Sequence, residues 1–153
     1  MKITLLTGPA GVGKDTFARE IIEGEERTAA IAFADYLKYT AHALGWDGMK
    51  DEKGRTFLQE LGDVVRRYDP EFWIKYVVVQ IIENPLIEHW VITDARFDNE
   101  VTYLRESFPE AEVEVIGLKR DYVSPLTEEQ QNHPTERGIS KKLIDTVVDL
   151  TEA

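Results

Sequence analysis

Residues 2–16 read KITLLTGPAGVGKDT. The first six of these residues form a short, apolar and β-branched run, which predicts a buried strand that Gly8-Pro9 ends. From Lys14 to about Glu25 the apolar residues recur at helical spacing, which predicts a helix. Four residues separate Gly8 from Gly13-Lys14, and this spacing between a strand and a helix is typical of a phosphate-binding loop.

The residue types in this loop suit a phosphate ligand. Glycines let backbone N–H groups turn inward around phosphate oxygens, and the helix N-terminus adds donors and partial positive charge. Lys14 is expected to reach the β- and γ-phosphates of ATP. The nucleotide-binding residues predicted here are Gly8, Gly11, Val12, Gly13, Lys14, Asp15 and Thr16. The alternative is a glycine-rich turn that only joins the strand to the helix.

Asp15 stands where such loops usually carry the Ser or Thr that ligates Mg²⁺. A carboxylate beside phosphates is repulsive unless a cation or a substrate group lies between them. We therefore expect Asp15 to act on Mg²⁺ or its water shell, with Thr16 donating to an α-phosphate. Whether Asp15 contacts the metal or the acceptor stays open at this point.

Short apolar runs alternate with longer amphipathic ones along the rest of the chain. Strands are predicted at 29–33, 88–94, 112–119 and 146–150, and helices at 35–44, 55–67, 70–83 and 99–107, with a polar connection at 51–54 and a long polar loop at 120–138. This alternation predicts a single α/β domain over residues 1–153, with a five-stranded parallel sheet and helices on both faces. The segments that begin at Gly8, Asp94 and Arg120 each follow a strand, so they should meet at one sheet edge.

Composition excludes several classes of function. The 153 residues include 18 Lys plus Arg and 29 Asp plus Glu, for a net charge of −11, which argues against broad binding to nucleic acid or anionic membranes. The absence of cysteine removes disulfides, thiolate zinc sites and cysteine nucleophiles. No apolar run is long enough to cross a bilayer, and the start lacks a signal-peptide core. A cytoplasmic location is therefore expected.

Five further segments carry a family resemblance. They are FADYLK (33–38), LQELGD (58–63) with Arg66, DPEFW (69–73), TDARFDNE (93–100) and HPTE (133–136). Together with the loop, they resemble the deoxynucleoside monophosphate kinases often encoded by bacteriophages, over residues 3 to about 138. Two features depart from the family pattern: Thr135 stands where serine is commoner, and a final covering helix is absent or very short.

The resemblance implies a three-layer P-loop kinase fold with a helical acceptor-binding insert at about 35–83 and a lid at about 120–138. It implies transfer of the γ-phosphoryl group of ATP to a deoxynucleoside monophosphate, with ATP and Mg²⁺ as cofactors. The partners would be these small molecules, with no nucleic acid or membrane, in the cytoplasm (of the host, if the protein is phage-encoded). The oligomeric state stays open, and a homodimer is compatible with the resemblance.

Several residues become candidates for the substrate site. They are Asp35, Lys38, Arg66, Trp73, Asp94 and Arg96. The resemblance favours Arg66 for the acceptor phosphate, which a guanidinium fork holds bidentately. Asp94 ends a strand, where it would hold Mg²⁺ together with Asp15, directly or through water; a turn or cap role is the alternative. Arg96 contacts a phosphate or forms a surface salt bridge, and Lys38 is a phosphate ligand or a surface residue.

The lid supplies two more candidates. Arg120 and Arg137 are expected to act with Lys14 and Asp15 as catalytic residues that neutralise the transferring phosphoryl group. His133 and Glu136 are expected to order the loop, and the alternative is a mobile surface loop without a catalytic role. Three functional alternatives stay open: a kinase of dephospho-coenzyme A, a kinase of a metabolite alcohol, and a non-catalytic ATP-binding regulator.

Overall fold

The computed structural model describes residues 1–133 and 136–151. Its single sheet contains β1 (Lys2–Thr7), β2 (Thr28–Ile31), β3 (His89–Ile92), β4 (Glu112–Lys119) and β5 (Thr146–Asp149), all parallel. The strand order is β2-β3-β1-β4-β5. Two strands therefore lie on each side of the central β1. In such sheets, ligands bind where the strand order reverses, which here is the loop after β1.

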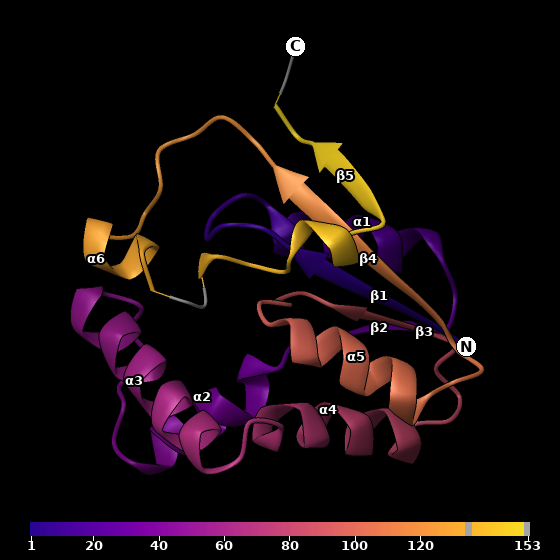
Figure 1. The fold of residues 1–153 in the computed structure, drawn as a ribbon, viewed down its shortest axis with the longest axis horizontal. Helices are drawn as coiled ribbons and strands as arrows, with labels where there is room; N and C mark the ends of the chain where they lie inside the picture. Colours follow the sequence, from indigo (N-terminus) through magenta and orange to yellow (C-terminus); the bar gives the residue numbers. More distant parts are fainter. Residues whose placement is uncertain (134–135, 152–153) are drawn as a thin grey trace.

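Helices cover both faces of the sheet, as Figure 1 shows. They are α1 (Lys14–Gly24), α2 (Ala34–Ala43), α3 (Glu52–Tyr68), α4 (Phe72–Glu83), α5 (Asp98–Ser107) and the short α6 (Glu128–Gln131), with a 3₁₀ turn η2 at Lys141–Leu143. The α1 helix packs on one face, and α4 and α5 pack on the other. The α/β class and the all-parallel five-stranded sheet are as predicted, and the arrangement is compatible with three layers.

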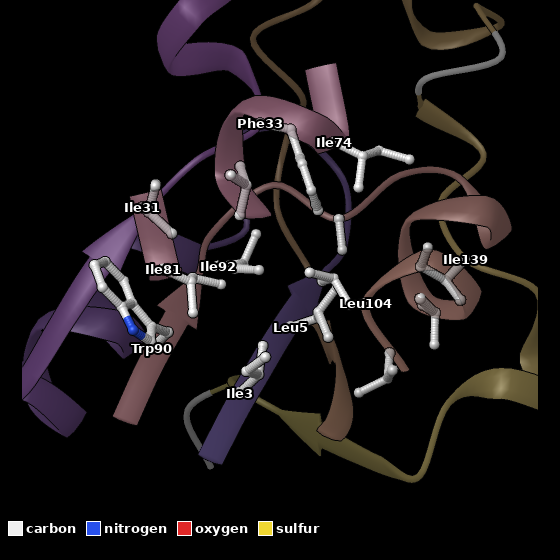
Figure 2. Close-up of a cluster of buried hydrophobic side chains, with 14 residues drawn as sticks. Ile3, Leu5, Ile31, Phe33, Ile74, Ile81, Trp90, Ile92, Leu104 and Ile139 are labelled. Atoms are coloured by element: carbon white, nitrogen blue, oxygen red, sulfur yellow. The ribbon is translucent and has the colours of Figure 1, made fainter. Parts of the chain in front are cut away.

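The core divides according to the alternation of side chains along the strands. Ile3 and Leu5 of β1 point toward α4 and α5, where they join a cluster that Figure 2 shows with Ile92 and Leu104. Leu6 points to the opposite face and packs with residues of the loop after β1 and of α1. Both faces of β1 are therefore buried, which is why apolar residues occur on both of its faces and even Thr4 and Thr7 are buried.

Four predicted boundaries are wrong. The second strand ends at Ile31 instead of Phe33, and Asp35 lies inside the first turn of α2, where its carboxylate accepts the N–H of Ala32 at 3.0 Å. Pro70 precedes α4, which begins at Phe72. The expected connection at 51–54 is instead the start of α3.

Asp51 explains the earlier start of α3. Its carboxylate caps the helix by accepting the N–H of Gly54 at 2.7 Å. A Cβ at Gly54 would lie 2.0 Å from the carbonyl oxygen of Met49, so this position requires glycine although it is inside a helix. The glycine suggested a connection in the sequence, whereas the structure uses it for close packing.

The segment at 120–138 is less irregular than a long polar loop would be. It contains α6, whose Thr127 hydroxyl accepts the N–H of Gln130 at 3.1 Å. Pro134 and Thr135 of the HPTE segment lie outside the described residues, and so do the last two residues beyond β5 that bear on a covering helix. None of the described helices combines the length and the apolar character that crossing a bilayer requires.

Candidate active site

A cavity of about 360 Å³ opens at the carboxyl edge of the sheet. Parts of the chain far apart in sequence line it: the loop after β1, the start of α1, the β2–α2 connection, α2, α3, the segment after β3, and the lid. Its polar lining consists of Lys14, Asp15, Lys38, Lys50, Arg55, Gln59, Arg66, Thr93, Asp94, Arg96, Glu100 and Glu136. Lys14, Asp15, Lys38, Arg66, Trp73, Asp94 and Arg96, all predicted from the sequence, are among the lining residues.

Two glycines shape the loop at the floor of the cavity. Gly13 precedes α1 with φ of +114°, a conformation that side chains rarely adopt. A Cβ at Gly8 would lie 2.7 Å from the carbonyl oxygen of Leu118 at the end of β4. Val12 is fully buried in the core on the α1 face, so its side chain anchors the loop. Thr16 is exposed on α1 and is absent from the described cavity lining.

Lys14 folds back over this loop. Its Nζ donates to the carbonyl oxygens of Gly8 at 2.6 Å and Pro9 at 3.1 Å. Burial, and next the positive charge of Arg96, lower the pKa of Lys14 to about 8. An anion in the cavity would offer the ammonium a stronger acceptor than two neutral carbonyls.

Asp94 connects the end of β3 to the start of α2. Its two carboxylate oxygens accept the N–H groups of Phe33 at 2.8 Å and Ala34 at 2.9 Å. Burial raises its pKa above the usual range. Asp94 therefore acts as a helix cap, which was the alternative to a magnesium ligand. The helix that it caps is α2, which is distant from Asp94 in sequence.

The magnesium ligands expected from the sequence are only partly suited to that role. Both oxygens of Asp94 already accept backbone N–H groups. Asp15 is exposed at the first turn of α1 and lines the cavity. Within residues 1–133 and 136–151, no group of three or more His, Cys, Asp or Glu side chains is arranged to hold a metal. These residues fit an ion held mainly by phosphate oxygens and water, with Asp15 as the available carboxylate.

Two arginines approach the cavity from different elements. The Arg66 guanidinium lies over the ring of Phe97, 4.6 Å from its centroid, and its Nη1 is 3.2 Å from Asp63 Oδ1. Burial lowers the pKa of Arg66. Arg96 donates through Nη1 to Glu136 Oε1 at 2.6 Å. Each arginine is thus held by a carboxylate, and both line the same cavity.

Glu100 anchors the helix after Arg96. Its Oε1 accepts the N–H groups of Arg96 at 2.7 Å and Phe97 at 2.9 Å, satisfying two donors at the start of α5. The side chain is buried, and burial raises the pKa of Glu100 to about 8. Burial therefore disfavours the charged form of this carboxyl, although its two N–H partners favour it.

The lid lies over the cavity and is held there by polar contacts. The Tyr122 hydroxyl donates to the Ala10 carbonyl, and Gln130 Nε2 donates to the Glu52 carbonyl at 3.0 Å. His133 Nε2 is 2.6 Å from Asp63 Oδ2. Figure 1 shows α6 beside the first turn of α3. The His133 contact is of the kind expected of a residue that orders this loop, whereas the contacts of Tyr122 and Gln130 follow no apolar pattern in the sequence.

The lid arginines lie elsewhere than expected. Arg120 Nη2 donates to the Gly11 carbonyl at 2.7 Å, and its guanidinium lies over the Tyr122 ring. Arg137 is exposed. Neither belongs to the described cavity lining, so a role of Arg120 and Arg137 in neutralising a phosphoryl group stays a prediction. Among the described lid residues, Glu136 is the charged residue that lines the cavity.

The helical insert contributes residues that the sequence analysis did not select. Lys50, Arg55 and Gln59 line the cavity, together with the apolar Phe33, Leu37 and Leu58. Asp35 is absent from the described lining, whereas Lys38 and Trp73 belong to it. Lys50 and Arg55 flank the Asp51 cap, so recognising that cap in the sequence would have placed both at the start of a helix.

Comparison with known proteins adds no relative. No protein-family model matches the chain, and no curated protein sequence matches it. The function must therefore be argued from the cavity itself.

Proposed function

We propose that the protein is a P-loop phosphotransferase that moves the γ-phosphoryl group of ATP to a deoxynucleoside monophosphate and so forms the diphosphate. The observation that carries the proposal is one cavity lined by cations from two parts of the chain. Lys14 and the glycine loop approach from the sheet, and Lys38 and Arg66 approach from the helical insert. Phosphoryl transfer between phosphates requires two anionic groups to be held next to each other.

The chain's overall charge makes this cavity unusual. Six of its lining residues are Lys or Arg and four are Asp or Glu, whereas the chain as a whole carries a net charge of −11. A cavity of this sign in an acidic protein supports an anionic ligand.

The residues of the chain would act by positioning and charge neutralisation. The loop N–H groups and Lys14 would hold the donor phosphates, and the insert would hold the acceptor, whose phosphate oxygen is itself the nucleophile. When bound, Mg²⁺ neutralises charge on the β- and γ-phosphates, and Asp15 is the carboxylate that would hold it or its water. The lid would exclude water, which matters because hydrolysis competes with transfer.

Turnover with a panel of acceptors tests the proposal. Deoxy- and ribonucleoside monophosphates are each incubated with Mg·ATP, and diphosphate products are separated by anion-exchange chromatography. We expect product from at least one deoxynucleoside monophosphate, and loss of product in Lys14→Ala.

Two other results would replace the proposal. Product only with a non-nucleotide acceptor, such as dephospho-coenzyme A, would assign a different kinase. Tight ATP binding without product from any acceptor would assign a nucleotide-binding regulator.

A further inference from the structure

The cations that line the cavity fall into an inner group and an outer group. The inner group comprises Lys14, Arg66 and Arg96 near the ends of β1 and β3. The outer group comprises Lys38 of α2, Lys50 of the α2–α3 connection and Arg55 of α3. The two groups differ in how their charge is balanced by the protein.

The inner group has protein counter-charges. Arg66 pairs with Asp63 and Arg96 pairs with Glu136, at 3.2 and 2.6 Å respectively. Asp94 and Glu136 are the negative charges that act most strongly on Lys14. Within the protein, the inner cations therefore have about as many negative as positive charges around them.

The outer group lacks such counter-charges. Within residues 1–133 and 136–151, no carboxylate lies within ion-pairing distance of Lys38, Lys50 or Arg55. Arg55 donates instead to the carbonyl of Pro125 at 3.1 Å. Asp15, at the start of α1, is the acidic residue of the cavity lining whose charge opposes the lowering of the Lys50 pKa.

The outer cations also lie close enough to affect one another. Burial, and next the positive charge of Lys38, lower the pKa of Lys50, and Arg55 acts in the same direction. The acidic neighbours of Lys50 in sequence are already engaged. Asp47 accepts the N–H of Met49 at 2.9 Å, and Asp51 accepts that of Gly54 at 2.7 Å.

Three outer cations thus face one carboxylate at the cavity, an excess of two positive charges. A phosphate monoester carries between one and a half and two negative charges near neutral pH, so one such group balances this excess. The apolar Leu37 and Leu58 and the buried Trp73 line the same cavity and offer a surface for the rest of the molecule.

We infer that Lys38, Lys50 and Arg55 form a subsite for one phosphate monoester group, the 5′-phosphate of a nucleotide acceptor. The inference rests on the proposed function for the identity of the acceptor. The resemblance favoured Arg66 as the main ligand of the acceptor phosphate. This inference assigns that role to the three outer cations instead, because Arg66 is already paired with Asp63.

Calorimetric titration tests this subsite without requiring turnover. The probes are the four deoxynucleoside 5′-monophosphates, each compared with its unphosphorylated deoxynucleoside, and inorganic tripolyphosphate for the loop after β1. Wild type is compared with Lys50→Gln and with the Lys38→Gln/Lys50→Gln double variant. Lys53→Gln is the matched control, because Lys53 is an exposed cation of α3 outside the cavity lining.

We expect Lys50→Gln to weaken monophosphate binding about tenfold, and the double variant to weaken it further. Binding of the deoxynucleoside should not change, tripolyphosphate binding should change less than twofold, and Lys53→Gln should match wild type. Thermal melts show whether each variant is folded, and both lysines are accessible enough for glutamine to replace them without a cavity in the core.

Three results would overturn the subsite. In the first, wild type binds a monophosphate no more tightly than its nucleoside. In the second, Lys50→Gln leaves the monophosphate affinity unchanged. In the third, Lys50→Gln lowers the affinities for monophosphate and for tripolyphosphate equally. Turnover separates this outcome from failure of the proposed function. If the protein binds monophosphate through these lysines but forms no diphosphate, the phosphate subsite is supported and the proposed kinase activity is contradicted.

Discussion

The carboxylate of Glu136 and the guanidinium of Arg96 form a 2.6 Å ion pair that joins the 120–138 segment to the segment after β3 at the cavity. The second oxygen of Glu136 accepts the N–H of Ala10, in the loop after β1, at 3.2 Å. The Glu136 side chain is only 8 % exposed. A lid carboxylate therefore engages a backbone N–H and an arginine that a phosphate oxygen would also use.

This relationship predicts that Glu136→Gln strengthens the binding of inorganic tripolyphosphate. Removing the negative charge removes a competitor for Arg96 and the loop, and we expect roughly a tenfold gain at low salt. Calorimetric titration measures it. Glu129→Gln is the control, because Glu129 is an exposed acid of α6 in the same lid. Weaker binding in Glu136→Gln would mean that the carboxylate mainly orders the loop.

Lys14→Ala should remove nearly all turnover while leaving the fold intact. Lys14 hydrogen-bonds to loop carbonyls and fills no part of the apolar core, so its loss opens no core cavity. Losing one transition-state donor costs ~10²–10³ in rate. The measurement is diphosphate formation at saturating substrates, beside a thermal melt. A variant that keeps more than half of the wild-type rate would exclude a catalytic role for Lys14.

Asp94→Ala should destabilise the protein because it leaves two N–H groups of α2 without their acceptors. An unsatisfied buried donor costs about 1–3 kcal/mol. Urea unfolding measures the change in the free energy of unfolding. Asp94→Asn should lower this free energy less than Asp94→Ala does, because the amide keeps one acceptor oxygen. Asp35→Ala is the matched control, since Asp35 is exposed and accepts only the N–H of Ala32. Equal losses in Asp94→Ala and Asp35→Ala would contradict the capping role.

Glu100 should make stability depend on pH. Its pKa is 4.5 in a model compound and about 8 in the folded protein, where burial raises it. Between these two pH values the folded state binds the extra proton, so the free energy of unfolding should fall as the pH rises. Glu100→Gln should flatten this part of the profile. Urea unfolding at a series of pH values measures it, and parallel profiles for the two proteins would show that Glu100 ionises normally.

Much of the fold could be predicted from the sequence because its signals are local. Buried parallel strands give short apolar runs, and the amphipathic helices between them give helical spacing. The same logic brought Lys14, Asp94 and Arg96 to one edge, since the carboxyl ends of parallel strands meet there. The start of α3 could not be predicted in this way, because the glycine at position 54 is a turn signal in most sequences and a packing residue here.

The positions of the lid and of the outer cations depend on tertiary contacts, which no local sequence pattern predicts. Arg120 follows a strand at the correct edge, but its side chain donates to the Gly11 carbonyl, and Arg120 itself does not belong to the described cavity lining. Lys50 and Arg55 reach the cavity only because the Asp51 cap starts α3 between them. The direction of a side chain in a loop is set by its tertiary partners, and those partners are distant in sequence.

The lid anchors have a consequence for the lifetime of any complex. They are divided between the loop after β1, through Ala10 and Gly11, and α3, through Glu52 and Asp63. A bound nucleotide beneath the lid can leave only after bonds of both sets have broken. Each is polar and is exchanged for a bond to water, so opening costs little free energy per bond but requires several to break together. For the proposed kinase, we therefore expect departure of product, and not the transfer itself, to limit the rate.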